Sequence, residues 1–225
     1  MDCEAILFDC DGVLVDSEPI TNGVLCEMLN EAGWALARAE CMRLFIGKTV
    51  RSEAARIEAE TRQPLTDAWL AAFYARRDHR LRAELRPIAG ALAAVRAAHA
   101  RLGGRIACAS GADRQKVEMQ LRMVGMAPYF GAHVFSGHEM PATKPAPDVY
   151  LAAAAALGVD PRRCLVVEDT VTGVQAGVAA GASVLGFAPT PGGYATPDAL
   201  RAAGAFHIMT DMAQLPALLE QSGAA

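Results

Sequence analysis

The sequence predicts a doubly wound, Rossmann-like α/β fold with a parallel sheet. It also predicts an all-helical domain inserted after the first strand. Two observations lead to this prediction. From residue 87 onward, short apolar runs alternate with helical segments of ten or more residues, as βαβ units require. Between residues 17 and 86, the residue spacing is helical only. We therefore expect an α/β core domain of residues 1–16 and 87–225 and a helical cap domain of residues 17–86.

The first strand and the helical stretch come first along the chain. Residues 5–9, AILFD, form an apolar run that ends in a carboxylate and continues into Asp-Gly, as a buried strand entering a loop would. Segments rich in Ala, Leu, Arg and Glu then run from Ser17 to about Arg82. A stretch of helices cannot lie inside a sheet, so we expect it to fold separately and to cover a site.

The remaining elements alternate between helix and strand. Helices are expected over about residues 89–102, 113–124, 147–157 and 171–180, and strands over residues 105–110, 133–136, 164–169 and 183–187. The last of these helices has Gly at every fourth position, namely Gly173, Gly177 and Gly181. This spacing favours close packing of the helix on the sheet over an interaction face.

Composition narrows the function classes. The chain has 225 residues, 52% of them hydrophobic, which is enough for a sizeable core. A net charge of −4 gives no basic field for nucleic acid, so a small-molecule partner is favoured. The six Cys form no CxxC pair and predict reduced thiols. No apolar run reaches the length of a membrane helix, so a cytoplasmic protein is expected. We expect it to be a monomer or weak dimer.

Polar residues follow the predicted strands at four places. They are, in chain order, Asp9-Cys10-Asp11-Gly12, Ser110-Gly111, Lys144-Pro145 and Glu168-Asp169. Each has an ordinary interpretation as a loop, turn or helix cap when it is taken alone. Together they are more informative, because ligands of open α/β sheets bind outside the carboxyl ends of the strands.

The chemistry of these residues indicates phosphoryl transfer. Acids that gather at one sheet edge repel each other, and a bound cation relieves that repulsion. Mg²⁺ fits such oxygen ligands, whereas no His or Cys cluster has the spacing of a zinc site. Lys144 and Ser110 add donors suited to phosphoryl oxygens. The sequence therefore predicts a magnesium-assisted site for a small phosphorylated molecule.

The order of these motifs resembles the haloacid dehalogenase-like hydrolase superfamily over essentially the whole chain. The four family motifs are similar, in order and spacing, to FDCDGVLVDSE, ASG, TKPAPDVY and VVEDTVTGVQAG. The helical stretch from Asp16 to about Arg86 resembles the smaller helical cap of that family. Within the family, FDCDGVLVDSE, FSG and TDMAQLPALL resemble bacterial sugar-phosphate and 6-phosphogluconate phosphatases. The resemblance implies a phosphatase that forms an aspartyl-phosphate.

By this resemblance, Asp9 is the nucleophile and Asp11 is the general acid and base. If the first strand continues that far, with Cys10 pointing into the sheet, residues 9 and 11 project toward the same side. Gly12 is expected to let the chain pass close to the phosphate, and Lys144 to balance the charge of Asp9. Ser110 and the backbone N–H of Gly111 are expected to donate to phosphate oxygens.

The resemblance also implies which residues hold Mg²⁺ and substrate. The expected metal ligands are Asp9, the backbone carbonyl of Asp11, and Asp169, while Glu168 is expected to contact these ligands or to reach the ion through a water molecule. Residues of the cap are expected to contact the unreactive part of the substrate. The candidates are Ser17, Glu18, Thr21, Gly47, Lys48, Arg51, Arg76 and Arg77, of which Lys48 is the best and the Arg pair is favoured as a solvated helix face.

Related activities are separated by single residues. A dehalogenase needs no acid at the position of Asp11, and phosphonate-cleaving relatives need a cap Lys that is missing from residues 1–47. β-Phosphoglucomutase carries a His in its cap where this chain has Thr21, so a phosphatase is favoured over a mutase. A non-catalytic member that binds a phosphorylated ligand is a third possibility, and it would show a lost motif residue. None is lost here.

Overall fold

The computed structural model describes residues 3–189 and 193–221. The chain divides into two compact units. We call Met1–Val15 with Pro87–Ala225 the core unit, and Asp16–Arg86 the helical unit. Each unit has its own buried apolar cluster. That of the core unit lies between the sheet and its helices, and that of the helical unit lies among its helices.

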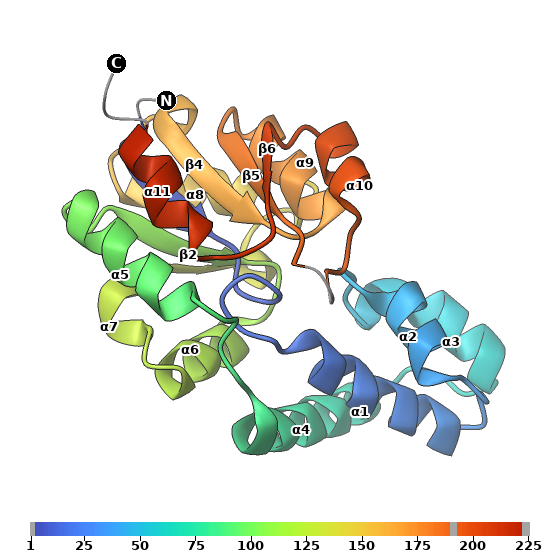
Figure 1. Ribbon diagram of the computed structural model, residues 1–225. Coiled ribbons are helices and arrows are strands. Elements are labelled where there is room, and N and C mark those ends of the chain that lie inside the picture. The colour runs from blue at the N-terminus through green and yellow to red at the C-terminus, as the bar shows by residue number, and fades with distance from the viewer. Residues whose placement is uncertain (1–2, 190–192, 222–225) are drawn as a thin grey trace. The chain divides into compact units, whose positions relative to one another are not determined.

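A parallel sheet forms the centre of the core unit (Figure 1). Its strands lie in the order β3-β2-β1-β4-β5-β6. The strands are β1 (Ala5–Phe8), β2 (Ile106–Ser110), β3 (Val134–Ser136), β4 (Cys164–Glu168), β5 (Ser183–Phe187) and β6 (His207–Met209). The central strand β1 is buried along its whole length. Strand order reverses between β1 and β4, which is where ligands bind in doubly wound sheets.

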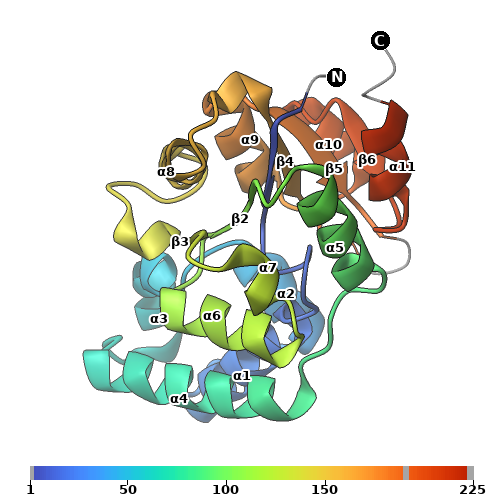
Figure 2. The same cartoon turned by 90° about the vertical axis from the view of Figure 1, so that its left-hand side faces the viewer.

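Helices cover both faces of this sheet (Figure 2). One face carries α8 (Asp148–Ala156), α9 (Val171–Ala179) and α10 (Pro197–Ala203); the other carries α5 (Ala91–Arg101), α6 (Arg114–Met123), α7 (Ala127–Phe130) and α11 (Gln214–Gln221). Short 3₁₀ turns precede α8 and β4, at Gly137–Glu139 and Pro161–Arg163. The prediction of a doubly wound parallel α/β fold is therefore confirmed.

The structure corrects one detail of the first strand. β1 ends at Phe8, one residue earlier than predicted, so Asp9, Cys10 and Asp11 lie in a loop. In that loop Asp11 bridges to Val15 and the N–H of Gly12 donates to the Val15 carbonyl at 2.8 Å. The directions of the Asp9 and Asp11 side chains therefore follow from this loop and not from strand alternation.

The glycines of α9 have different roles. A Cβ on Gly177 would lie 2.8 Å from Val184 Cγ2 of β5, so this residue fits the prediction of close helix-to-sheet packing. A Cβ on Gly173 would overlap the carboxylate of Glu168, the last residue of β4, and Gly181 lies beyond the end of the helix. Gly173 and Gly177 therefore both pack closely against strands of the sheet, as predicted, and Gly181 does not.

The helical unit contains α1 (Glu18–Glu31), α2 (Arg38–Phe45), a 3₁₀ turn (Arg51–Glu53), α3 (Ala54–Thr61) and α4 (Asp67–Glu84). Its apolar cluster includes Val24, Leu29, Phe45, Ile57 and Phe73. No strand occurs between residues 16 and 86, as the helical spacing predicted. Among the described residues of the whole chain, no helix combines the length and apolar character that a bilayer crossing requires.

Candidate active site

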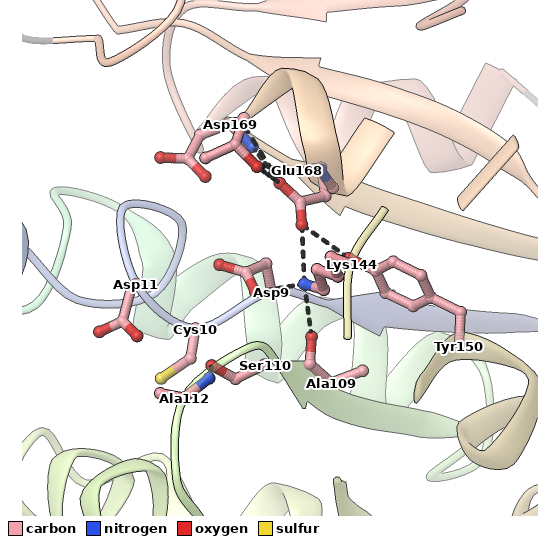
Figure 3. Close-up of polar contacts among 12 residues, drawn as sticks. Asp9, Cys10, Asp11, Ala109, Ser110, Ala112, Lys144, Tyr150, Glu168 and Asp169 are labelled. Carbon is pink, nitrogen blue, oxygen red and sulfur yellow. Dashed lines mark hydrogen bonds and ion pairs between the residues drawn. The ribbon is translucent and has the colours of Figure 1, made fainter. Parts of the chain in front are cut away.

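The ends of three neighbouring strands bring together residues from distant parts of the chain. Asp9 follows β1, Ser110 is the last residue of β2, and Glu168 is the last residue of β4. The register pairs Phe8 of β1 with Cys108 of β2 and with Val167 of β4, so the carboxyl ends of these three strands lie side by side. Figure 3 shows their side chains with those of Lys144 and Asp169 at this edge of the sheet.

Lys144 links two of the acids. Its Nζ donates to Asp9 Oδ1 at 2.6 Å, to Glu168 Oε1 at 2.7 Å and to the Ala109 carbonyl at 2.9 Å (Figure 3). The Lys144 and Asp9 side chains are each 9% exposed. A buried charge is tolerated where it is paired and hydrogen-bonded, and Lys144 meets both conditions.

Burial and charge shift the pKa values of this group. Burial raises the pKa of Asp9 to about 7, because desolvation outweighs the opposing attraction of Lys144. Burial also lowers the pKa of Lys144, but the Asp9 and Glu168 carboxylates outweigh it and hold that pKa above its ordinary value. Lys144 therefore stays protonated at neutral pH and can balance negative charge beside Asp9.

Glu168 organises the site through its hydrogen bonds. Its Oε1 accepts from Lys144 and from the Tyr150 hydroxyl at 2.9 Å. Its Oε2 accepts from the backbone N–H groups of Asp169 and Thr170 and from the Thr170 hydroxyl. The same hydroxyl accepts from the Gly173 N–H and caps α9. These bonds occupy both oxygens, which suits a residue that orients Lys144 and Asp169.

The carboxylates of Asp9, Glu168 and Asp169 form a group that could hold a metal ion. One oxygen from each lies within 4.8 Å of the others, and all three residues are buried. The donor set consists of hard oxygens, which suits Mg²⁺. Gly12 leaves room for Asp169: its φ is +81°, and a Cβ at this position would overlap the Asp169 carboxylate. The structure therefore supplies a reason for Gly12 that the sequence did not give.

Ser110 ends β2, and Gly111 begins the loop that follows. The Ser110 hydroxyl is buried and accepts from the Ala112 N–H at 3.1 Å. This bond uses the oxygen as an acceptor and leaves the hydroxyl hydrogen able to turn toward an anion. The predicted phosphate contacts of Ser110 and of the Gly111 N–H stay predictions.

Asp11 is held by residues that the sequence did not single out. Its Oδ1 accepts from Lys116 Nζ at 2.7 Å and from Gln120 Nε2 at 3.0 Å, both from α6. The side chain of Asp11 therefore stands outside the group of three acids. The resemblance assigns the Asp11 backbone carbonyl, not its carboxylate, to the metal.

The basic side chains among the predicted substrate contacts pair with acids of the helical unit itself. Lys48 Nζ lies 3.0 Å from Glu53, and Arg51 donates to Asp67 at 2.7 Å. Arg76 pairs with Glu31, and Arg77 is buried, pairs with Asp78 and lies over the Tyr74 ring. Ser17 is buried, and the Thr21 hydroxyl is also shielded from water. The roles predicted for Ser17, Thr21, Lys48 and Arg51 stay predictions.

Sequence reasoning missed Tyr150, Lys116 and Gln120. A signal existed for Lys116, since the chain has only three Lys and the other two were singled out. Lys116 and Gln120 are also four residues apart, which places them on one face of a helix. Tyr150 is the last residue of the TKPAPDVY motif, six residues after Lys144, but no role was predicted for it.

Comparisons with known proteins identify the family. A sequence model described as haloacid dehalogenase-like hydrolase matches residues 3–181. The chain belongs to this family. It is 31% identical over 189 residues to the 6-phosphogluconate phosphatase of Escherichia coli strain K12, covering 84% of each protein. It is also 31% identical to hexitol phosphatase B of that organism over 182 residues, covering 78% of this chain and 79% of the relative.

A solved structure agrees with these matches. A haloacid dehalogenase family hydrolase from Deinococcus radiodurans R1, with bound phosphate and sodium, aligns with a TM-score of 0.79. It is 33% identical, and the alignment covers 99% of this chain and 97% of that one. The predicted family and hydrolase class are thus confirmed.

Proposed function

We propose that this haloacid dehalogenase-like hydrolase is a Mg²⁺-dependent phosphatase of a small phosphorylated metabolite, of the sugar-phosphate or phosphogluconate type. The observation that carries the proposal is the buried Asp9 carboxylate, hydrogen-bonded to Lys144 beside Glu168 and Asp169. Relatives named for 6-phosphogluconate and hexitol phosphatase activity support the substrate class.

In the proposed first half-reaction, an Asp9 oxygen attacks phosphorus and an acyl phosphate bond forms. The bond from phosphorus to the leaving oxygen breaks, and Asp11 gives that oxygen a proton. In the second half-reaction, Asp11 takes a proton from water, the water oxygen attacks phosphorus, and the bond to Asp9 breaks. Lys144 balances the charge of Asp9 and the phosphoryl group throughout.

The proposed cofactor, Mg²⁺, is suggested by the three grouped acids Asp9, Glu168 and Asp169. Asp9, Asp169 and the backbone carbonyl of Asp11 would hold Mg²⁺, with Glu168 orienting the neighbouring groups. When bound, the ion supplies positive charge to the phosphoryl oxygens. We further propose that residues 17–86 act as the cap domain that selects the substrate, with Ser17, Thr21, Lys48 and Arg51 as its contacts.

The proposal is tested by phosphate release from a panel of 6-phosphogluconate, hexitol phosphates, phosphoglycolate, nucleotides and glucose 1- and 6-phosphate, with Mg²⁺ and with chelator. We expect release from a sugar phosphate or phosphogluconate that stops with chelator and returns with Mg²⁺. Interconversion of the glucose phosphates without release would favour a mutase. The absence of any turnover would favour a binding protein.

The metal proposal also predicts an effect at Gly12. In Gly12→Ala, the new Cβ would displace the Asp169 carboxylate, so Mg²⁺ should bind about 10 to 100 times more weakly. The measurement is a Mg²⁺ titration followed by thermal shift and by activity. Gly125→Ala is the matched control, because Gly125 has a φ of +71° but nothing within 4 Å of an added Cβ. Equal Mg²⁺ affinities in the two variants would contradict the prediction.

A further inference from the structure

The Asp11 carboxylate is held by a buried cation. Lys116 Nζ lies 2.7 Å from Asp11 Oδ1, and the Lys116 and Asp11 side chains are 5% and 13% exposed. A lysine so poorly hydrated is costly unless its charge is paired. The position of Lys116 is therefore coupled to that of Asp11.

Gln120 fixes the same carboxylate from the next turn of the helix. Its Nε2 donates to Asp11 Oδ1 at 3.0 Å, while its Oε1 accepts from the Cys10 thiol at 3.6 Å. Gln120 is fully buried, so its amide spans two successive residues of the loop after β1. The loop that carries the proposed nucleophile and acid is thereby attached to α6.

The start of α6 places both donors. Asp113 caps the helix by accepting from the Lys116 N–H at 2.9 Å. Residues four apart lie on one face of a helix, so fixing the first turn aims Lys116 and Gln120 at the same point. Asp113 is only three residues after Ser110, so the short loop after β2 also fixes where α6 begins and thereby positions Lys116 and Gln120.

We propose that Lys116 and Gln120 are positioning residues that hold the Asp11 carboxylate in place for proton transfer. This inference rests on the proposed phosphatase function. Both donors contact Oδ1 and so fix the orientation of the carboxylate that gives the leaving oxygen its proton. The same carboxylate then takes a proton from the attacking water, and Asp11 returns to its first state.

Geometry favours this role over direct contact with the transferring phosphate. In Figure 3 the Asp9 carboxylate is engaged by Lys144, while Asp11 lies apart, farther along the loop. Lys116 donates to Asp11, whereas Lys144 donates to Asp9. A group that acts through Asp11 should matter most when the leaving oxygen needs a proton.

The test compares two substrates with different leaving groups. 6-Phosphogluconate releases an alcohol that needs protonation, whereas p-nitrophenyl phosphate releases a stable phenolate. For Lys116→Met we expect kcat/KM to fall about 100-fold with 6-phosphogluconate and less than about 10-fold with p-nitrophenyl phosphate. Asp11→Asn should show the same preference, and the double variant should be no worse than Asp11→Asn alone. Lys116→Arg should recover part of the loss.

Gln120→Leu is measured in parallel because it removes a neutral donor and leaves no buried charge unpaired. A preferential loss with 6-phosphogluconate in this variant supports the proposal even if Lys116→Met does not fold. Equal losses with both substrates, or additive losses with Asp11→Asn, overturn it while leaving the phosphatase intact. A wild-type protein that releases phosphate from neither substrate overturns the proposed function and this inference together.

Discussion

Asp9→Asn is expected to abolish phosphate release while the protein stays folded. The amide has no anionic oxygen to attack phosphorus, so the acyl phosphate cannot form. Removal of a nucleophile in other enzymes indicates a loss in kcat of about 10⁵-fold or more. Phosphate release from the best substrate of the panel, with Mg²⁺ present, measures this loss.

A chemical trap makes the Asp9 experiment specific. Borohydride reduces an acyl phosphate to an alcohol, so wild-type protein quenched during turnover should yield a peptide with homoserine at position 9. The Asn variant should yield none. Asp160→Asn is the control, since Asp160 is a carboxylate that pairs with Arg162 at the surface. Turnover by the Asn variant, or homoserine at another Asp, would contradict a nucleophilic Asp9.

The same variant should change how stability depends on pH. The pKa of Asp9 is raised from 3.8 to about 7 by burial, so the folded state binds this proton more tightly than the unfolded state. The resulting stability is complete below pH 3.8 and is lost as pH rises through about 7. Asp9→Asn removes this loss.

Thermal unfolding in chelator measures the difference. Between pH 5 and pH 8, the Tm of the wild type should fall relative to that of Asp9→Asn, and Mg²⁺ should reduce the gap because a bound cation favours the ionised carboxylate. If the Tm values of the two proteins changed with pH in the same way in chelator, burial would not raise the pKa of Asp9.

The sequence predicts those parts of the site that the sheet alone positions. Asp9, Ser110 and Glu168 stand at the ends of apolar runs, and parallel strands bring such ends to one edge. Lys144 could be included because its family motif is specific. The positions of these residues depend on strand order and register, which the alternation of strands and helices largely determines.

The parts that depend on side-chain direction could not be predicted. The Asp11 carboxylate accepts a hydrogen bond from Lys116 of α6 because β1 ends at Phe8 and a tight loop directs the Asp11 side chain toward that helix. A strand pattern in the sequence cannot show this direction. Lys48 pairs with Glu53 of the following 3₁₀ turn, a partner that the predicted substrate contact did not include.

Short elements also escape a pattern of residues. β6 is a three-residue strand, too short for an apolar periodicity, and its first residue, His207, is exposed. The four-residue helix α7 begins with Ala-Pro, which on its own is as typical of a turn. Both elements exist because of what they pack against, so tertiary contacts decide them and local propensity does not.

Lys144→Met is expected to be both inactive and strongly destabilised. Methionine is similar in length but carries no charge, so the Asp9 and Glu168 carboxylates would lose their shared buried cation. Removing one partner of a buried ion pair costs about 3–5 kcal/mol. We expect the free energy of unfolding at pH 8 to fall by that amount in chelator, and kcat to fall at least about 100-fold.

Lys48→Met is the matched control for stability, because it also breaks one Lys–Glu pair. Lys48 is 44% exposed, and exposed pairs contribute about 0–1 kcal/mol. Chemical denaturation at pH 5 and pH 8 separates charge from packing. At pH 5 Asp9 is protonated in the folded state, so the penalty in Lys144→Met should shrink, whereas a packing defect would cost the same at both pH values. A penalty that does not change with pH would mean that Lys144 supports the fold and leaves Asp9 electrostatically unaffected.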